Sequence, residues 1–213
     1  GWGERLRDHC GFLMNVLMTG GGSGSSYTNS AIGGLPLPAG EVEPRFTAPT
    51  HVDRAEFAHR LSPPSAGGVV YRVPDSREGW VEALCRLTDL AEDGGGTITF
   101  DMTDVRPRGS AINGFGGTAS GPAPLIELLI NVADLLNRCV GQSFTSMDLM
   151  EIDHAIAACV IAGNVRRSAR QSIKSWRDHD ILDFVHAKAD PSQHWSTNLS
   201  VAIDDEFISA LKA

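Results

Sequence analysis

Apolar residues recur at helical spacing in four long stretches of the chain. They predict helices over residues 4–18, 76–93, 123–139 and 146–162. Asp75 and Ser76 precede Glu78, which is a typical start signal for the second of these helices. A shorter helical pattern covers about 178–187, and Asp204 begins a final one. Helices therefore make up much of the predicted structure.

Short strand-like runs lie between these helices. They cover residues 69–73, 97–100 and 198–203, and we count about four strand candidates in all. Strands that alternate with helices favour an α/β architecture with largely parallel pairing. So few strands would not close a barrel by themselves. Residues 33–68 are rich in Pro, Gly and Ala and predict an irregular excursion, with a short helix over 53–60.

The segment with the strongest chemical signal is 114–122, which reads GFGGTASGP. Glycine lets a backbone approach an anion closely and adopt positive φ. Ser120 is placed to cap the helix that follows, and Pro122 suits its first turn. Free N–H groups at a helix start favour phosphate. The segment therefore predicts a loop shaped around a phosphorylated ligand, with a purely structural tight turn as the alternative.

A second glycine run, GGGSG at 20–24, follows the first predicted helix. It resembles an anion cradle, and a plain helix-terminating loop is the equal alternative. The run lacks the lysine of a P-loop, and a helix rather than a strand precedes it, so it is not a dinucleotide fingerprint.

A third segment, 162–170, places Arg166, Arg167 and Arg170 beside a glycine. Guanidinium groups suit phosphate or base-edge recognition, whereas the alternative is a solvated helix end. Arg106 and Arg108 leave a similar choice open. They either bind an anion or pair with carboxylates of the acidic surface.

Composition narrows the function classes. The 213 residues carry a net charge of −8, which argues against a broad nucleic-acid-binding surface. No apolar run reaches the roughly 18 residues of a membrane span.

The seven histidines lack metal-site spacing, so we expect no metal. The four cysteines form no CxxC pair, and we expect buried or half-buried, reduced thiols, which fit a cytoplasmic protein. The cysteines are Cys10, Cys85, Cys139 and Cys159. Both ends of the sequence suggest a piece of a longer chain.

Taken together, the motifs resemble one family. In chain order they are GGGSG at 20–24, DSREGW at 75–80, RPRG at 106–109, GFGGTASGP at 114–122, AGNVRRSA at 162–169 and NLSV at 198–201. This order is similar to the core of class II, adenosylcobalamin-dependent ribonucleotide reductases, with the closest likeness to the ribonucleoside-triphosphate reductase branch.

The resemblance implies a fold and an activity. Residues 1–213 would be a fragment of a ten-stranded α/β barrel, incomplete in this chain, with an irregular insertion at about 31–68. Such enzymes replace the ribose 2′-hydroxyl with hydrogen through a cysteine thiyl radical started by adenosylcobalamin. The implied partners are a ribonucleoside triphosphate substrate, a deoxynucleoside triphosphate effector and a thioredoxin-like reductant, with no nucleic acid and no membrane.

The resemblance also implies site residues. The substrate-binding residues would be Gly117, Thr118, Ala119, Ser120 and Gly121. The effector specificity loop would contain Gly163, Asn164, Arg166, Arg167 and Ser168. The effector-region glycines would be Gly20, Gly21, Gly22 and Gly24. The family's radical cysteine lies in an NPCxE-like segment that this sequence lacks, so no catalytic residue is assigned.

Two other hypotheses remain open at this stage. The chain is alternatively a non-catalytic nucleotide-binding or regulatory module that kept the loops and lost the chemistry. An unrelated α/β oxidoreductase that binds a dinucleotide is the third possibility. The lack of a predicted strand before either glycine loop counts against it.

Overall fold

The computed structural model describes residues 2–47, 68–112, 117–162 and 169–212. Within them the helices are α1 Leu6–Met18, α2 Asn29–Ile32, α4 Arg77–Glu92, α5 Ala123–Arg138, α6 Ser146–Ala162, α7 Ile181–His186 and α8 Asp205–Lys212. The strands are β1 Gly22–Ser26, β2 Val42–Thr47, β3 Val69–Arg72, β4 Gly96–Asp101, β5 Ala169–Ser175 and β6 Thr197–Ala202. The α/β class predicted from the sequence is confirmed.

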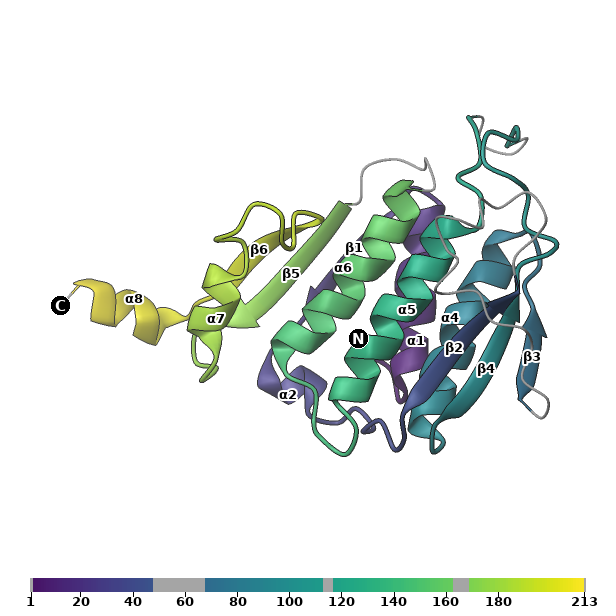
Figure 1. Cartoon of the computed structure of the whole chain (residues 1–213). Helices are drawn as coiled ribbons and strands as arrows, with labels where there is room; N and C mark the ends of the chain where they lie inside the picture. The colour runs from purple at the N-terminus through teal and green to yellow at the C-terminus, as the bar shows by residue number, and fades with distance from the viewer. Residues whose placement is uncertain (1, 48–67, 113–116, 163–168, 213) are drawn as a thin grey trace.

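The strands form two parallel sheets. Their orders are β1-β5-β6 and β2-β4-β3, and every strand pair within them is parallel. Figure 1 shows the sheets on opposite sides of α1, α5 and α6, while α4 packs on α1 and against β2 and β4. No helix in the described part of the chain is long and apolar enough to cross a membrane.

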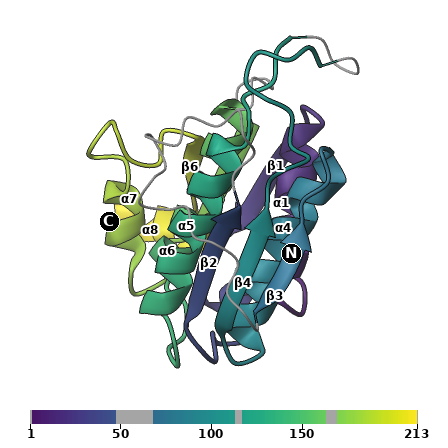
Figure 2. The ribbon, with the colours of Figure 1, turned by 45° about the vertical axis from the view of Figure 1, so that its right-hand side comes forward.

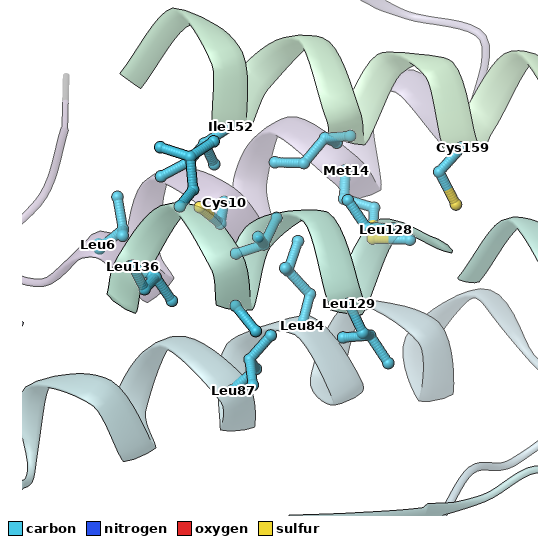
Figure 3. Packing of buried hydrophobic residues seen from close by; sticks show 14 of the residues in the cluster. Leu6, Cys10, Met14, Leu84, Leu87, Leu128, Leu129, Leu136, Ile152 and Cys159 are labelled. Atoms are coloured by element: carbon cyan, nitrogen blue, oxygen red, sulfur yellow. The ribbon is translucent and has the colours of Figure 1, made fainter. Parts of the chain in front are cut away.

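One hydrophobic core joins the four long helices. Figure 3 shows side chains of α1, α4, α5 and α6 pointing toward one another, with Leu84 of α4 and Leu128 and Leu129 of α5 among them. These three leucines are at most 1% exposed. Burying a leucine side chain stabilises a fold by about 1.5–3 kcal/mol relative to leaving it exposed. The interlocked helices therefore hold both sheets in place.

The predicted cap residue is right for helix α4 and wrong for helix α5. Ser76 caps α4 and accepts a hydrogen bond of 3.0 Å from the Gly79 N–H, as its sequence predicts. Helix α5 begins where the sequence predicts, but the prediction that Ser120 caps it is wrong, because the N-cap is Pro122 and the Ser120 hydroxyl donates to the Gly121 carbonyl. Ser120 lies two residues before the N-cap position, too early to reach the N–H groups that a cap satisfies.

The glycine run at 20–24 has a structural explanation. Helix α1 ends in a Schellman motif, in which the Gly20 N–H bonds the Leu17 carbonyl and the Gly21 N–H bonds the Val16 carbonyl. Gly20 adopts a φ of 77°, which favours glycine. The chain then continues directly into β1, so the run both ends a helix and begins a strand.

The prediction for residues 33–68 is only partly right. Strand β2 lies inside this region and pairs with β4 along its whole length. Val42 and Phe46 are its buried positions, whereas Pro44 between them weakens the sequence signal. Proline is tolerated there because β2 is an edge strand of its sheet. The helix predicted over 53–60 lies outside the described residues.

Candidate functional site

A pocket of about 320 Å³ lies where β3 and β4 end. The segment after β3 supplies Asp75, and the segment after β4 supplies Val105 and Arg106. The last turns of α1 and α6 contribute Met18 and Val160. Ligands of open parallel sheets typically bind at the carboxyl ends of the strands. Figures 1 and 2 show the segment after β4 extending beyond the helix ends at this end of the molecule.

An ion pair organises the polar side of the pocket. The Arg106 Nε donates to Asp75 Oδ2 at 2.6 Å, and its Nη1 donates to the Ala111 carbonyl at 3.1 Å. The two side chains are 36% and 31% exposed, so ligands and water can reach them. The pairing that the sequence left open for Arg106 is therefore present. It also ties the segment after β4 to the start of α4.

Residues 109–112 pair with residues 117–119 of the glycine-rich segment 114–122 as a short hairpin. The Ala119 N–H bonds the Ser110 carbonyl at 2.7 Å, and the Gly109 N–H bonds the Ala119 carbonyl at 2.8 Å. Ala111 and Thr118 form an antiparallel bridge. This pairing delivers the chain to Gly121, whose φ is 74°.

The structure brings part of the predicted substrate loop to the pocket. Ala119, Ser120 and Gly121 line it, whereas Gly117 and Thr118 lie in the exposed hairpin. Residues 114–116 lie outside the described residues. A Cβ built on Gly121 would lie 3.1 Å from the Arg108 backbone nitrogen, so glycine lets these two segments approach closely.

The two predicted effector segments have different outcomes. The pocket lining does not include Gly20, Gly21, Gly22 or Gly24, although Met18 just before them belongs to it. Gly163, Asn164, Arg166, Arg167 and Ser168 lie outside the described residues. Cys159 and Val160, which precede that segment, also line the pocket. Of the three arginines proposed for ligand recognition in that segment, Arg170 points inward instead and is 4% exposed.

The thiols in the chain are shielded. All four cysteines are free and buried, as the sequence predicts. Cys159 is the cysteine that lines the pocket, and burial raises its pKa, with Glu127 adding to the effect. Burial likewise raises the pKa of Cys85 and of Cys139 to about 11. The thiolate is the nucleophile and the metal ligand, so these groups are poor nucleophiles near neutral pH.

A buried polar network that the sequence did not reveal surrounds Asp153 of α6. The carboxylate is fully buried, accepts from the Tyr27 hydroxyl, and lies 2.8 Å from His9 Nε2 and 3.3 Å from Arg170 Nη2. Burial raises the pKa of Asp153, but His9, Arg170 and Tyr27 together hold it below its usual value. The network joins α1, β1, α6 and β5.

His154, the next residue of α6, extends this network toward β6. Arg170 Nη1 donates to the Ser196 hydroxyl at 3.0 Å, and that hydroxyl lies 2.7 Å from His154 Nδ1. Arg170 can only donate, so the Ser196 hydroxyl accepts from it and keeps its own proton free to bond His154 Nδ1. Burial, with the nearby His194 and Arg170, lowers the pKa of His154 to about 4. Within the described residues, no group of His, Cys, Asp and Glu could hold a metal ion.

Comparisons with known proteins agree with one another. Residues 47–136 match the family model described as "B12-dependent ribonucleotide reductase, insertion domain". A crystal structure of a B12-dependent, class II ribonucleotide reductase superposes with a TM-score of 0.82 and 32% identity, covering 95% of this chain and 29% of that one. The chain thus corresponds to a region of class II, B12-dependent ribonucleotide reductases.

Individual class II relatives show the same extent of match. An adenosylcobalamin-dependent ribonucleoside-triphosphate reductase of Lactobacillus acidophilus is 37% identical over 92% of this chain and 29% of its own length. A Mycobacterium phage D29 protein, named provisionally for the same activity, is 39% identical over the whole chain and 33% of its own length. The chain therefore spans about a third of the length of these class II reductases.

The insertion-domain match and the predicted insertion overlap only in part. The sequence predicts an irregular insertion at about 31–68. The family model of the insertion domain instead covers 47–136 and includes β3, α4, β4 and most of α5. The pocket residues Asp75, Arg106 and Ser120 all lie within the matched region. The division of the chain into domains stays a prediction.

Proposed function

We propose that this chain is part of an adenosylcobalamin-dependent ribonucleoside-triphosphate reductase and that its pocket binds a nucleoside triphosphate. The matches to class II reductases support the first part. The second part rests on one observation, the Arg106–Asp75 pair beside Ala119–Gly121 at the carboxyl ends of two parallel strands. In this proposal the strands belong to a larger α/β barrel, and the enzyme works in the cytoplasm.

The polar side of the pocket suits the two hydrophilic parts of a nucleotide. A guanidinium offers several N–H donors in one plane, and two of them can bind two phosphate oxygens at the same time. Arg106 uses Nε and Nη1 in the bonds described above, which leaves its other donors for phosphate. The Asp75 carboxylate can accept hydrogen bonds from sugar hydroxyl groups. Each end of the ion pair thus has a partner on the ligand.

The family's cofactor does not fit this pocket. Adenosylcobalamin supplies the radical that starts ribonucleotide reduction when it is bound. Its corrin ring and nucleotide tail are together several times larger than a space of about 320 Å³. We therefore assign the cofactor, the radical cysteine and the thioredoxin-like reductant to other parts of the enzyme.

A regulatory role for the pocket is the second candidate, and Cys159 favours it. Cys159 is the pocket's cysteine, and burial raises its pKa and so keeps its thiol protonated. Thiol–disulfide exchange requires the thiolate, so the pocket suits binding better than disulfide redox chemistry. In this version the nucleotide is a deoxynucleoside triphosphate effector rather than the substrate on the predicted 117–121 loop.

Titration calorimetry of the chain with ATP and dATP tests the proposal. We expect triphosphate binding that Arg106→Gln weakens by about tenfold or more, because a hydrogen bond to a charged group contributes about 1.5–3 kcal/mol and tenfold corresponds to 1.4 kcal/mol. Arg72→Gln is the matched control, since Arg72 also pairs with an aspartate at 2.6 Å but lies outside the pocket.

The same titrations separate the two candidates. Tighter binding of ATP than of dATP supports a substrate pocket, whereas tighter binding of dATP supports an effector pocket. Equal loss in the Arg106→Gln and Arg72→Gln variants, with unchanged circular dichroism, would contradict the assignment of Arg106. Failure of both nucleotides to bind the wild-type chain would contradict the pocket as a nucleotide site.

A further inference from the structure

The pocket has an apolar wall that phosphate recognition does not use. Three helices contribute to it, with Met18 from α1, Trp80 from α4 and Val160 from α6, and Ile112 adds to it from the hairpin. Trp80 is the one aromatic residue among the described residues that line the pocket. An indole at a pocket wall offers a flat π-surface that aliphatic neighbours cannot provide.

Trp80 is held in place before any ligand arrives. The backbone N–H of Trp80 donates to the Ser76 carbonyl at 3.2 Å, and the partly buried side chain packs against the core. Gly79 beside it is buried, and a Cβ there would lie 2.5 Å from the Pro74 carbonyl oxygen. The first turn of α4 is therefore seated closely on the preceding segment. A rigid aromatic side chain loses little conformational entropy when it binds a ligand.

The position of Trp80 along α4 matches the layout of a nucleotide. Ser76 lies at the start of the helix beside the Asp75–Arg106 pair, and Trp80 follows four residues later on the same helix face. Four residues correspond to about 6 Å along a helix axis. In a nucleotide one sugar separates the phosphates from the base. A ligand with its phosphates at Arg106 would thus bring its base to the apolar wall.

We propose that Trp80 stacks on the base of the bound nucleotide and makes the pocket prefer purines to pyrimidines. This inference rests on the proposed function, because it requires a nucleotide in the pocket. Stacking on an aromatic side chain accepts every base, and its strength grows with the overlapping ring area. A two-ring purine covers more of an indole than a one-ring pyrimidine does. Met18 and Val160 would enclose the base without offering it hydrogen bonds.

The test compares the affinities of dATP, dGTP, dCTP and TTP for the wild-type chain and three variants. We expect the wild-type chain to bind the purine nucleotides several-fold more tightly than the pyrimidine ones. Trp80→Leu should weaken purine binding by about tenfold and bring the purine-to-pyrimidine ratio close to one. Trp80→Phe should keep an intermediate ratio, because phenylalanine retains a smaller stacking surface.

The control variant is Trp195→Leu, which removes a tryptophan that is 46% exposed and lies outside the pocket. It should leave all four affinities unchanged. A wild-type ratio near one, or an unchanged ratio in Trp80→Phe and Trp80→Leu, would overturn the role of Trp80 while leaving the pocket a nucleotide site. No binding of any nucleotide to the wild-type chain would overturn the proposed function, and this inference with it.

Discussion

At the scale of single residues, Gly121 combines two constraints that glycine alone meets. Its φ of 74° is unfavourable for other L-residues by about 1–2 kcal/mol, and a Cβ there would lie 3.1 Å from the Arg108 backbone nitrogen. We expect Gly121→Ala to destabilise the chain and to weaken nucleotide binding, because the loop must move away from Arg108. Urea denaturation and calorimetry measure the two effects.

Gly141 provides a matched control for this substitution. Its φ of 71° is almost the same, but nothing lies within 4 Å of a Cβ built there. Gly141→Ala should therefore show the backbone cost alone and leave nucleotide affinity unchanged. Equal losses of stability and affinity in the two variants would mean that the close approach of Gly121 to Arg108 has no role in the site.

His154 links residue chemistry to the pH dependence of stability. Burial and the neighbouring His194 and Arg170 lower its pKa from 6.5 to about 4, so protonation favours the unfolded chain. Its contribution to stability is complete above about pH 6.5 and is lost as the pH falls toward 4. We expect His154→Gln to lose less stability than the wild-type chain between pH 7.5 and 5 in urea denaturation. A glutamine can still accept the proton of Ser196.

His186→Gln is the control for this pH effect, because His186 is exposed at the end of α7. Its pH dependence should match that of the wild-type chain. If His154→Gln follows the same curve as the wild type, protonation of His154 does not govern the acid side of the stability profile.

At the scale of elements, hydrophobic periodicity predicted the long helices closely. Helix α5 shows why, because its buried face consists of leucine, isoleucine, valine and alanine at helical spacing. Cap residues placed the start of α4 to within a residue, since Ser76 and Glu78 act through local contacts. Such features depend only on neighbours in the sequence.

Strands β1 and β5 could not be predicted in the same way. Strand β5 alternates between buried and exposed positions, but its buried residues are Arg170, Ser172 and Lys174, which is the reverse of the usual hydrophobic signal. Strand β1 is made of glycine and serine and has little intrinsic strand preference. Both strands depend on the buried network around Asp153 and on pairing with each other, and that pairing joins Gly22 to Ala169, far apart in the sequence.

The candidate site was predictable in part for a related reason. The glycine-rich composition of 114–122 indicated a close backbone approach, and Ala119, Ser120 and Gly121 do line the pocket. For the other pocket residues Asp75 and Trp80, the sequence pattern indicates only a helix start and a helix face. Nothing in their local pattern shows that the ends of β3 and β4 bring them together with residues 40 positions away.

At the scale of the whole molecule, a single core connects both parallel sheets. The buried cluster includes Leu17 near β1 as well as Phe46 and Phe100 of the other sheet. The four long helices of Figure 3 bridge these ends. The pocket takes its walls from α1, α4 and α6, so its shape depends on this shared packing. We infer that the described part of the chain unfolds as one cooperative unit.

Leu84 provides the test of this cooperativity. It is 0% exposed in the middle of α4, and Leu84→Ala should cost about 2–5 kcal/mol of unfolding free energy through the cavity it leaves. Because the core is shared, amide hydrogen exchange should lose protection by similar factors in β4 and in β5, although β5 lies in the other sheet. Leu182→Ala, at a side chain that is 67% exposed, should change neither strand. Loss of protection confined to β2, β3 and β4 would instead show two units that unfold independently, and the pocket would then lie where those units meet.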